Sequence, residues 1–331
     1  MEQPLVSIIL PTYNVERFLR KCLDSLANQT YKNVEVIIVI DGATDSSYDI
    51  AKEYCQKYPH YAVYWQENQG SGPARNNGLS RAKGELIMFV DPDDWCEPDY
   101  VENMVRYQME NNCDLVITRD IIAKCTSAGE ILQYNNKSCD FEMCESQDQV
   151  RKDYARLLTS DLISSPHAKL YKKSIIDANS VSFPALRRSQ DIAFNYRYYS
   201  YINNYCISPK NGYVYRIIPS ERSTKIRKDY YSIISVLYND IQSMYKNWGM
   251  AFESASIPNH FFTRLCGHFY LTKPSAQELC EILSDPVLRQ LVKDAQPIRK
   301  DRKICHSLLK GEKYRMASLA LSFFSLVKKF A

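Results

Sequence analysis

Three carboxylates, Asp91, Asp93 and Asp94, directly follow the apolar run 87–90. Acids this close together repel one another and are costly to remove from water, and a bound cation relieves both penalties. Hard carboxylate oxygens suit Mg²⁺ or Mn²⁺, and such an ion keeps coordination positions free for substrate phosphates. Asp-Pro and Asp-Asp pairs also form tight turns. Taken alone, these acids therefore indicate either a divalent metal site or a plain turn at the end of a strand.

Segments with strand and helix patterns alternate on both sides of these acids. The expected strands cover residues 6–10, 34–40, 61–65, 85–90 and 115–117, and the expected helices include residues 18–26, 74–82 and 98–111. This alternation across residues 5–118 predicts an open, mostly parallel α/β sheet flanked by helices. Ligands of such sheets bind at the carboxyl ends of the strands. We therefore expect three segments to line one crevice, namely Thr12-Tyr13-Asn14, Asp41-Gly42 and Asp91 to Asp94.

The rest of the chain is irregular at first and then helical. The predicted elements are a hairpin or mobile segment at 119–145, helices at 147–159 and 190–203, and a strand at 213–216. From about residue 228 onward the pattern is helical and rich in Tyr and Lys. We therefore predict a catalytic or binding domain at 1–225 and a mainly helical region at 226–331.

Composition excludes several classes of function. The formal net charge of +4 over 331 residues is too small to predict nucleic-acid binding. The 11 cysteines are scattered without CxxC spacing, so structural zinc is not expected. No secretory signal and no apolar run of about 18 residues is present, and unpaired thiols favour a reducing, cytoplasmic location.

Five motifs occur in one order over about ninety residues. They are Val6-Ser7-Ile8-Ile9-Leu10-Pro11-Thr12-Tyr13-Asn14, Leu26-Ala27-Asn28-Gln29-Thr30-Tyr31, Ile38-Val39-Ile40-Asp41-Gly42-Ala43-Thr44-Asp45, Gly72-Pro73-Ala74-Arg75-Asn76-Asn77-Gly78-Leu79 and Asp91-Pro92-Asp93-Asp94. This series resembles the bacterial inverting glycosyltransferases of family 2, which have the GT-A fold. The resemblance implies a GT-A domain with a helical C-terminal extension. It also implies a metal-dependent enzyme of hexosyltransferase type that acts in bacterial surface polysaccharide synthesis. Such an enzyme moves a monosaccharide from a nucleotide diphosphate sugar, expected to be a UDP-sugar, to a hydroxyl of a glycan or lipid-linked acceptor. The reaction inverts the configuration of the anomeric carbon.

The resemblance also implies roles for single residues. It assigns the donor nucleotide to Pro11, Thr12, Tyr13, Asp41, Arg75 and Asp91. Asp41 would accept the ring N–H of a uracil-type base, and Arg75, expected in the first turn of a helix, would contact the phosphates or the base. Many relatives have Asp-Asp-Gly where this chain has Ile40-Asp41-Gly42. The alternative interpretation is that Asp41 is only a turn residue before Gly42.

The same resemblance also assigns the residues that bind the metal and the residue that acts as general base. Asp93 matches the acid that binds Mn²⁺ or Mg²⁺ most directly, and Asp94 helps to hold the metal or the sugar. Asp191 is the candidate general base, which takes the proton of the acceptor hydroxyl. It follows Gln190, where the family usually has Glu. His167, Lys169 and Arg188 are candidate contacts to the acceptor or the phosphates, and Arg222 is a weaker one.

The C-terminal segment 314–331 combines apolar residues with Lys328 and Lys329. It is predicted to lie on the inner face of the cell membrane, to pack on the second domain, or to form part of a homodimer interface. Two alternatives to an active transferase remain open at this point. One is a catalytically inactive nucleotide-sugar-binding module or adaptor, and the other is a metal-dependent phosphatase.

Overall fold

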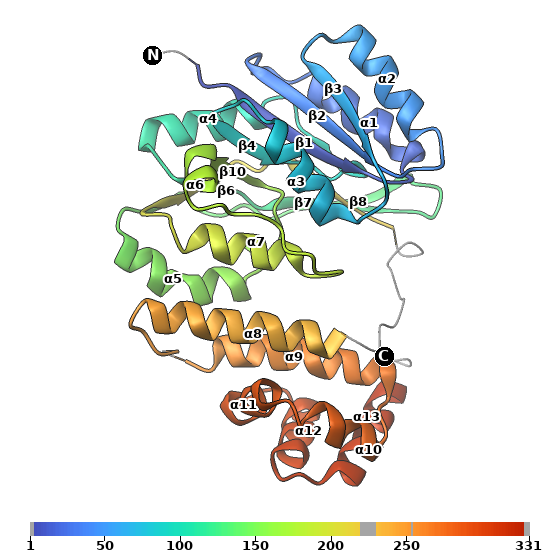
Figure 1. The fold of residues 1–331 in the computed structure, drawn as a ribbon, viewed down its shortest axis with the longest axis vertical. Coiled ribbons are helices and arrows are strands. Elements are labelled where there is room, and N and C mark those ends of the chain that lie inside the picture. The colour runs from blue at the N-terminus through green and yellow to red at the C-terminus, as the bar shows by residue number, and fades with distance from the viewer. Residues whose placement is uncertain (1–2, 219–229, 253, 328–331) are drawn as a thin grey trace. The chain divides into compact units, whose positions relative to one another are not determined.

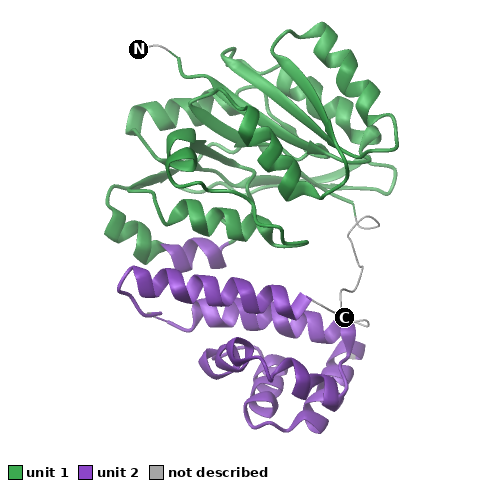
Figure 2. Ribbon diagram, in the orientation of Figure 1, with its two compact units in different colours: residues 1–153, 161–222 green, residues 154–160, 223–331 purple. Residues whose placement is uncertain are grey.

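The computed structural model describes residues 3–218, 230–252 and 254–327. The chain divides into two compact units, one of residues 1–153 with 161–222 and the other of residues 154–160 with 223–331 (Figure 2). The boundary proposed after residue 225 and the candidate Arg222 lie outside the described residues.

The first unit is built on an eight-stranded sheet (Figure 1). In spatial order its strands are β3 (Tyr61–Gln66), β2 (Val34–Asp41), β1 (Val6–Thr12), β4 (Leu86–Phe89), β10 (Lys169–Lys172), β6 (Leu115–Ile117), β11 (Tyr205–Ile207) and β9 (Glu142–Cys144). The first four strands in this order are parallel, and β10 runs antiparallel to both β4 and β6. The five strands predicted from the sequence all belong to this sheet.

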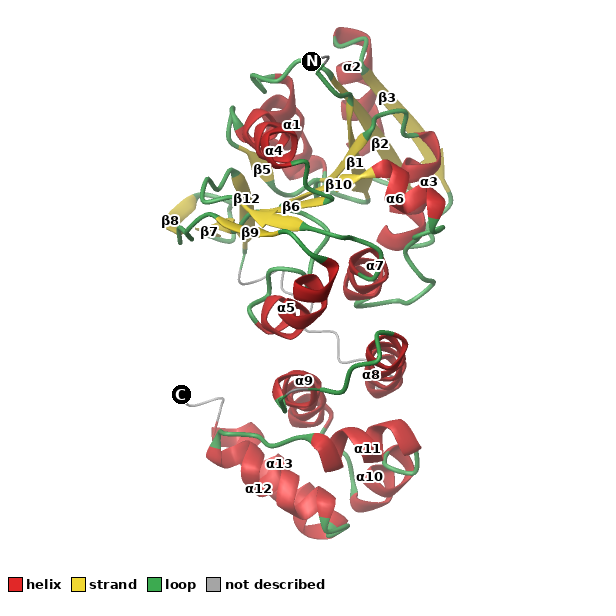
Figure 3. Cartoon of the chain, turned by 90° about the vertical axis from the view of Figure 1, so that its left-hand side faces the viewer, coloured by secondary structure: helices red, strands yellow, loops and turns green. Residues whose placement is uncertain are grey.

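Helices cover both faces of the sheet, as expected for its buried β-branched strands (Figure 3). Alternate residues of β1, including Ile8, belong to a core shared with α1 (Glu16–Ala27), α2 (Ser47–Lys57) and α4 (Tyr100–Asn111). The intervening residue Ile9 faces α3 (Ser71–Arg81) on the other side. A Cβ on Gly78 of α3 would lie 2.4 Å from Ile9 Cγ2, so this close approach of helix and strand requires glycine.

Helix α3 begins three residues earlier than the predicted start at residue 74. Pro73 lies in its first turn, where a missing N–H breaks no intrahelical bond. Arg75 therefore lies in the second turn of α3 and not in the first. The remaining helices of this unit are α6 (Lys173–Ala178), α7 (Gln190–Tyr199) and the first turns of α5 (Gln147–Thr159).

A second, four-stranded sheet contains the chain directly after the three acids. Its order is β5 (Trp95–Cys96), β12 (Tyr213–Ile217), β7 (Asp120–Cys125) and β8 (Ile131–Asn136). The antiparallel pair β7–β8 forms a hairpin within the irregular segment 119–145, in agreement with one of its two predicted forms. The predicted strand at 213–216 is confirmed as β12, which pairs with both β5 and β7.

The second unit is helical. Its helices are α8 (Tyr230–Asn247), α9 (Ser256–Thr272), α10 (Ala276–Ile282), α11 (Pro286–Asp294), α12 (Lys300–Lys310) and α13 (Tyr314–Val327), and α5 (Gln147–Thr159) contributes its last turns. The predicted α/β fold with a helical C-terminal region is thus confirmed. Across residues 3–218, 230–252 and 254–327, we find no helix with the length and apolar character needed to cross a membrane.

Candidate active site

The three predicted loops leave the sheet at the same edge. Strands β1 and β2 are in parallel register with Thr12 opposite Ile40, and β1 pairs with β4 so that Ile9 lies opposite Phe89. The backbone N–H of Val90 donates to the carbonyl of Ile9 at 3.1 Å. The segments that follow Thr12, Asp41 and Val90 therefore all emerge at the carboxyl ends of neighbouring parallel strands.

Arg75 joins two acids that are a hundred residues apart. Its Nη2 lies 2.7 Å from Asp91 Oδ1 and its Nη1 lies 2.8 Å from Asp191 Oδ1. The arginine side chain is only 5% exposed. Burial by itself lowers the pKa of Arg75, but the charges of Asp191 and Asp91 outweigh this effect, so the pKa of Arg75 is raised. The guanidinium and His167 in turn hold the pKa of Asp91 below its usual range.

This arrangement places the candidate base beside the first acid of the cluster. Asp191 is in the first turn of α7, and the Gln190 side chain before it is hydrogen-bonded to the Ser71 hydroxyl at the start of α3. Burial raises the pKa of Asp191, and Arg75 opposes that rise. Helices α3 and α7 thus bring together Arg75 and Asp191, which are 116 residues apart in the sequence.

We expect replacement of Arg75 by methionine to lower both stability and activity. The variant leaves two partly buried carboxylates without their shared cation, which costs about 2–4 kcal/mol of the free energy of unfolding. Urea denaturation followed by circular dichroism measures this loss. Arg81→Met, on the exposed side of the same helix, is the matched control. Arg81 contacts Asn77 and the Tyr64 ring at the surface, so its loss should change the free energy by about 1 kcal/mol or less. Equal losses in both variants would contradict the bridging role.

Asp94 and Asp93 have different environments. Asp94 is buried, and it accepts hydrogen bonds from the Tyr213 hydroxyl at 2.6 Å and the Arg216 backbone N–H at 2.7 Å. Burial and the charges of Asp93 and Asp91 raise its pKa. Asp93 is exposed, and desolvation together with the charge of Asp91 raises its pKa to about 6. Asp94 therefore anchors the loop to β12, whereas the carboxylate of Asp93 is open to a ligand.

His167 lies between two carboxylates. Its Nδ1 is 3.3 Å from Asp91 Oδ2 and its Nε2 is 3.3 Å from Asp120 Oδ2. The ring stacks on Tyr213 with centroids 4.6 Å apart and planes 2° apart. Burial lowers the pKa of His167, but Asp120 and Asp91 outweigh this and raise it to about 10. The imidazolium thus compensates the charge of both acids.

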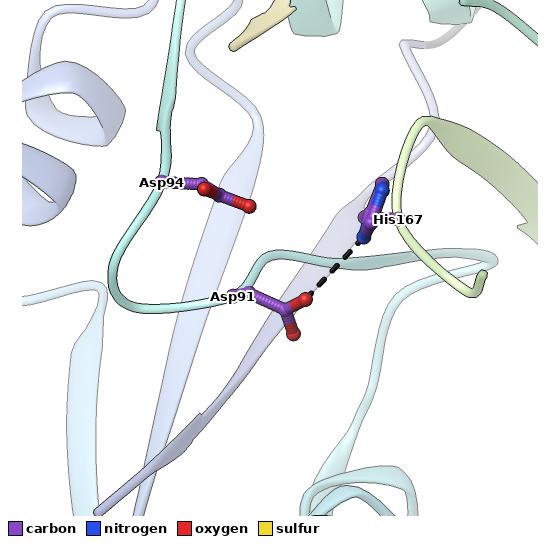
Figure 4. A group of neighbouring side chains, drawn as sticks. All are labelled: Asp91, Asp94 and His167. Carbon is purple, nitrogen blue, oxygen red and sulfur yellow. Dashed lines mark hydrogen bonds and ion pairs between the residues drawn. The ribbon is translucent and has the colours of Figure 1, made fainter. Parts of the chain in front are cut away.

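Asp91, Asp94 and His167 form a group that fits a divalent cation. Each offers one ligand atom, and these atoms lie within 4.8 Å of one another (Figure 4). Carboxylate oxygen and neutral imidazole nitrogen are common ligands of divalent transition metals such as Mn²⁺, so His167 would have to release a ring proton to bind the ion. Asp93, predicted to bind the metal most directly, is not a member of this group, although it belongs to the same loop.

Two site residues had no recognisable signal in the sequence. Asp120 is the first residue of β7, in the segment predicted to be irregular, and one of its oxygens, Oδ1, is buried without a hydrogen-bond partner. Tyr213 was part of a predicted strand, but its contact with Asp94 depends on the second sheet. Tyr213 and Tyr215 alternate along β12 and both stack on His167, but their spacing alone does not show which ring they would meet.

We expect replacement of His167 by phenylalanine to destabilise the protein by about 1–3 kcal/mol. Phenylalanine keeps an aromatic ring against Tyr213 but removes both contacts to carboxylates, so that Asp91 and Asp120 lose their shared partner. Chemical denaturation measures the change. The control His60→Phe concerns an exposed histidine and should be close to neutral. A His167→Phe variant as stable as the parent would show that the two contacts contribute nothing.

The predicted nucleotide-binding residues at β1 differ in accessibility. Pro11 and Thr12 are buried, and the Thr12 hydroxyl donates to the Leu10 carbonyl at 3.3 Å. Tyr13 is 52% exposed, so it is the member of this segment whose side chain is open to a ligand.

Asp41 organises the loop that leads into α3. It is buried and accepts hydrogen bonds from Gln66 Nε2 at 2.8 Å, the Gln69 N–H at 2.9 Å and the Gly70 N–H at 2.8 Å. Three of the roughly four acceptor positions of this carboxylate are therefore used within the protein.

The last two candidates lie on other elements. Lys169, the first residue of β10, is buried, and its ammonium donates to the His167 carbonyl at 3.0 Å. Burial lowers the pKa of Lys169 to about 8. Arg188 is half-buried in the loop before α7.

Comparison with known proteins identifies the class to which this fold and site belong. The family model for glycosyl transferase family 2 matches residues 7–180. EpsH of Bacillus subtilis is 37% identical over 243 residues, which cover 72% of this chain and 68% of EpsH. The chain therefore belongs to glycosyl transferase family 2, and the expected family is confirmed.

Other relatives have named activities. Poly(ribitol-phosphate) beta-glucosyltransferase of Bacillus spizizenii is 29% identical over 217 residues, which cover 64% of this chain and 32% of that protein. Among solved structures, S. aureus TarS 1-349 in complex with UDP-GlcNAc has a TM-score of 0.69 at 20% identity, over 96% of this chain and 91% of TarS 1-349. The mannosyltransferase PcManGT from Pyrobaculum calidifontis, in complex with GDP-Man and Mn²⁺, has a TM-score of 0.53 at 15% identity, over 100% of this chain and 88% of PcManGT. These structural likenesses establish the GT-A-like fold.

Proposed function

We propose that this protein transfers a monosaccharide from a UDP-sugar to a hydroxyl of a glycan or lipid-linked acceptor, with inversion at the anomeric carbon, in surface polysaccharide synthesis. The observation that carries the proposal is the Arg75 bridge, which holds Asp191 next to Asp91 at the carboxyl edge of the sheet. The named activities of relatives support it, since one is a glucosyltransferase and a neighbour of like fold binds UDP-GlcNAc.

The donor nucleotide would lie over the ends of β1, β2 and β4. The exposed ring of Tyr13 can stack on the base. Asp41 would accept the ring N–H through its remaining acceptor position, and a base without that N–H would leave the position unpaired. Arg75 acts through Asp91 and Asp191 and not directly on the phosphates, because both ends of its guanidinium are already engaged.

Asp93 and Asp94, with Asp91 and His167 beside them, would hold Mn²⁺ or Mg²⁺. When bound, this ion supplies Lewis-acid stabilisation of the departing diphosphate. The contacts of Asp94 to Tyr213 and Arg216 keep the loop in one conformation, and Lys169, at its lowered pKa, adds positive charge below the site.

Asp191 would act as the general base. Its carboxylate takes the proton of the acceptor hydroxyl while that oxygen attacks the anomeric carbon from the face opposite the diphosphate. The bond from the anomeric carbon to the diphosphate breaks with both electrons leaving on the diphosphate. A single displacement needs one carboxylate and gives inversion, whereas a double displacement needs a second carboxylate as nucleophile. Arg75 holds Asp191 in place and favours its ionised form before the proton is taken.

A cytoplasmic location is part of this proposal. All 11 cysteines, each within the described residues, are free thiols. Free thiols in this number are typical of a reducing compartment.

The proposal is tested by binding and turnover with the same preparation. Isothermal titration of UDP in Mn²⁺ and in EDTA should show tighter binding with the metal. Incubation with UDP-sugars and a glycan acceptor should release UDP and give a product of inverted anomeric configuration by NMR. Metal-dependent UDP binding without any turnover would instead support an inactive nucleotide-sugar-binding module, and preferred binding of another nucleotide would overturn the assignment of UDP.

A further inference from the structure

Helix α13 presents an apolar stripe that no described part of the chain covers. Met316, Leu319, Phe323 and Leu326 are 56%, 72%, 61% and 51% exposed, and their spacing of three, four and three residues places them on one face. The opposite face is buried through Ala317 and Leu321. The helix is therefore anchored in the second unit by one side and displays its most apolar side chains on the other.

The region that contains this stripe carries an excess of positive charge. Residues 223–331 contain 17 lysines and arginines against 9 aspartates and glutamates, although the whole chain has a net charge of only +4. Helix α12 packs against α13 and exposes Lys300, Lys303 and Lys310, and Lys313 and Arg315 follow before the stripe (Figure 1). Within the described ranges, no ion pair neutralises any of these five cations.

The acidic residues of the neighbouring helix α10 do not outweigh this excess of positive charge. Helix α10 also packs against α13 and exposes Glu278 and Glu281. Glu278 accepts the Ser275 N–H at 2.7 Å in a capping box, and Glu281 accepts from Gln277 at 3.1 Å. These bonds to neutral donors leave both carboxylates charged, and the exposed Glu312 before α13 is a third acid. The five cations still outnumber these three acids.

We propose that α12 and α13 form a docking surface for a bilayer that contains anionic phospholipids. A helix of 14 residues is about 21 Å long, which is less than the roughly 30 Å hydrocarbon core, so α13 would lie in the interface and not cross it. The apolar stripe would enter the acyl boundary, while cations of α12 and of the start of α13 would contact lipid phosphates. This pairing of an apolar stripe with a basic rim is typical of interfacial helices.

Charge favours a lipid surface over a second copy of the chain as the occupant. A two-fold interface brings the same patch of each protomer together, so two regions that each carry an excess of lysine and arginine would face one another. Like charges brought together in this way oppose association. An anionic bilayer neutralises them instead. The inference depends on the second unit alone and not on the proposed donor or mechanism.

Sedimentation with vesicles tests this proposal on the full chain. We expect the protein to bind vesicles of phosphatidylcholine with phosphatidylglycerol at least about tenfold more strongly than vesicles of phosphatidylcholine alone, and to be released by high salt. The double variant L319E/F323E should lose at least about tenfold of this binding, since it places charge where the apolar contact forms. K300E/K303E should lose a similar amount on anionic vesicles.

The matched control is L132E, because Leu132 of β8 is 69% exposed and lies in the first unit. It should bind like the parent protein, and circular dichroism checks that every variant is folded. Equal binding of L319E/F323E and the parent, or no binding of the parent to either vesicle, would overturn the proposal. A parent dimer that becomes monomeric in L319E/F323E, without vesicle binding, would identify a second copy as the occupant and also overturn it. Loss of sugar transfer with vesicle binding intact would affect only the proposed function.

Discussion

Asp191→Asn should reduce sugar transfer by about 10²–10⁴-fold while leaving the affinity for UDP within a few-fold of the parent value. The amide cannot take a proton from the acceptor hydroxyl at neutral pH. Its oxygen can still accept the hydrogen bond from Arg75 Nη1, now 2.8 Å from the Asp191 carboxylate, so the fold of the site should persist. Initial rates of UDP release, with UDP titrated calorimetrically in parallel, separate the two effects.

The control for this variant is Asp177→Asn, which changes an exposed carboxylate on α6. It should transfer at close to the parent rate. A second control is the denaturation midpoint of Asp191→Asn, which should be near that of the parent. Transfer at the parent rate by Asp191→Asn would place the base on another residue. A loss of UDP affinity equal to the loss of rate would instead make Asp191 a structural partner of Arg75.

Asp93→Ala should remove the difference between UDP binding in Mn²⁺ and in EDTA. Metal contacts to a diphosphate contribute several kcal/mol, so we expect donor binding with Mn²⁺ to weaken, and transfer to fall, by at least about 100-fold. The exposed Asp93 carboxylate makes no contact that holds the loop, whereas Asp94 is bonded to Tyr213 and Arg216. Asp93→Ala therefore tests metal binding with little effect on the fold.

Asp94→Ala is expected to behave differently. It removes the acceptor for the Tyr213 hydroxyl and the Arg216 N–H, so it should also lower the free energy of unfolding by about 1–3 kcal/mol. Asp49→Ala, an exposed acid on α2, serves as the control for both variants. Unchanged metal dependence in Asp93→Ala, with Asp94→Ala inactive, would move the metal to the group of Asp91, Asp94 and His167.

Much of the fold could be predicted because its signals are local. The apolar runs of β1, β2 and β4 and the helical spacing within α1 are each readable within about ten residues. The position of Asp91 at the end of a strand follows from the same pattern. A hairpin at 119–145 and the strand β12 were predicted, but their union in a second sheet was missed. Strand β5 has only two residues, and the sequence of β7 shows little alternation of apolar and polar residues although its burial alternates, so their pairing with β12 could not be recognised.

The start of α3 in the structure changes the position of Arg75 within the helix. Arg75 was expected in the first turn of a helix, where it would face an anion beside the free N–H groups. Because α3 begins at Ser71, Arg75 lies in the second turn and is directed to Asp91 and Asp191. The three-residue difference in the start of the helix thus accompanies a link between two acids that was not predicted, and the phosphate contact of Arg75 stays a prediction.

The sequence by itself determined which loops carry the chemistry, since parallel strands must place the segments after Thr12, Asp41 and Val90 at one edge. Only the tertiary structure decided which of these side chains meet. The contacts of Arg75 with Asp191, of His167 with Asp120 and of Asp94 with Tyr213 join residues 116, 47 and 119 positions apart. Such contacts depend on the registers of two sheets and on the start of α7, and no local pattern encodes them. The same holds for the α13 stripe, because helical spacing shows that a face is apolar, but only packing decides which face stays open to solvent.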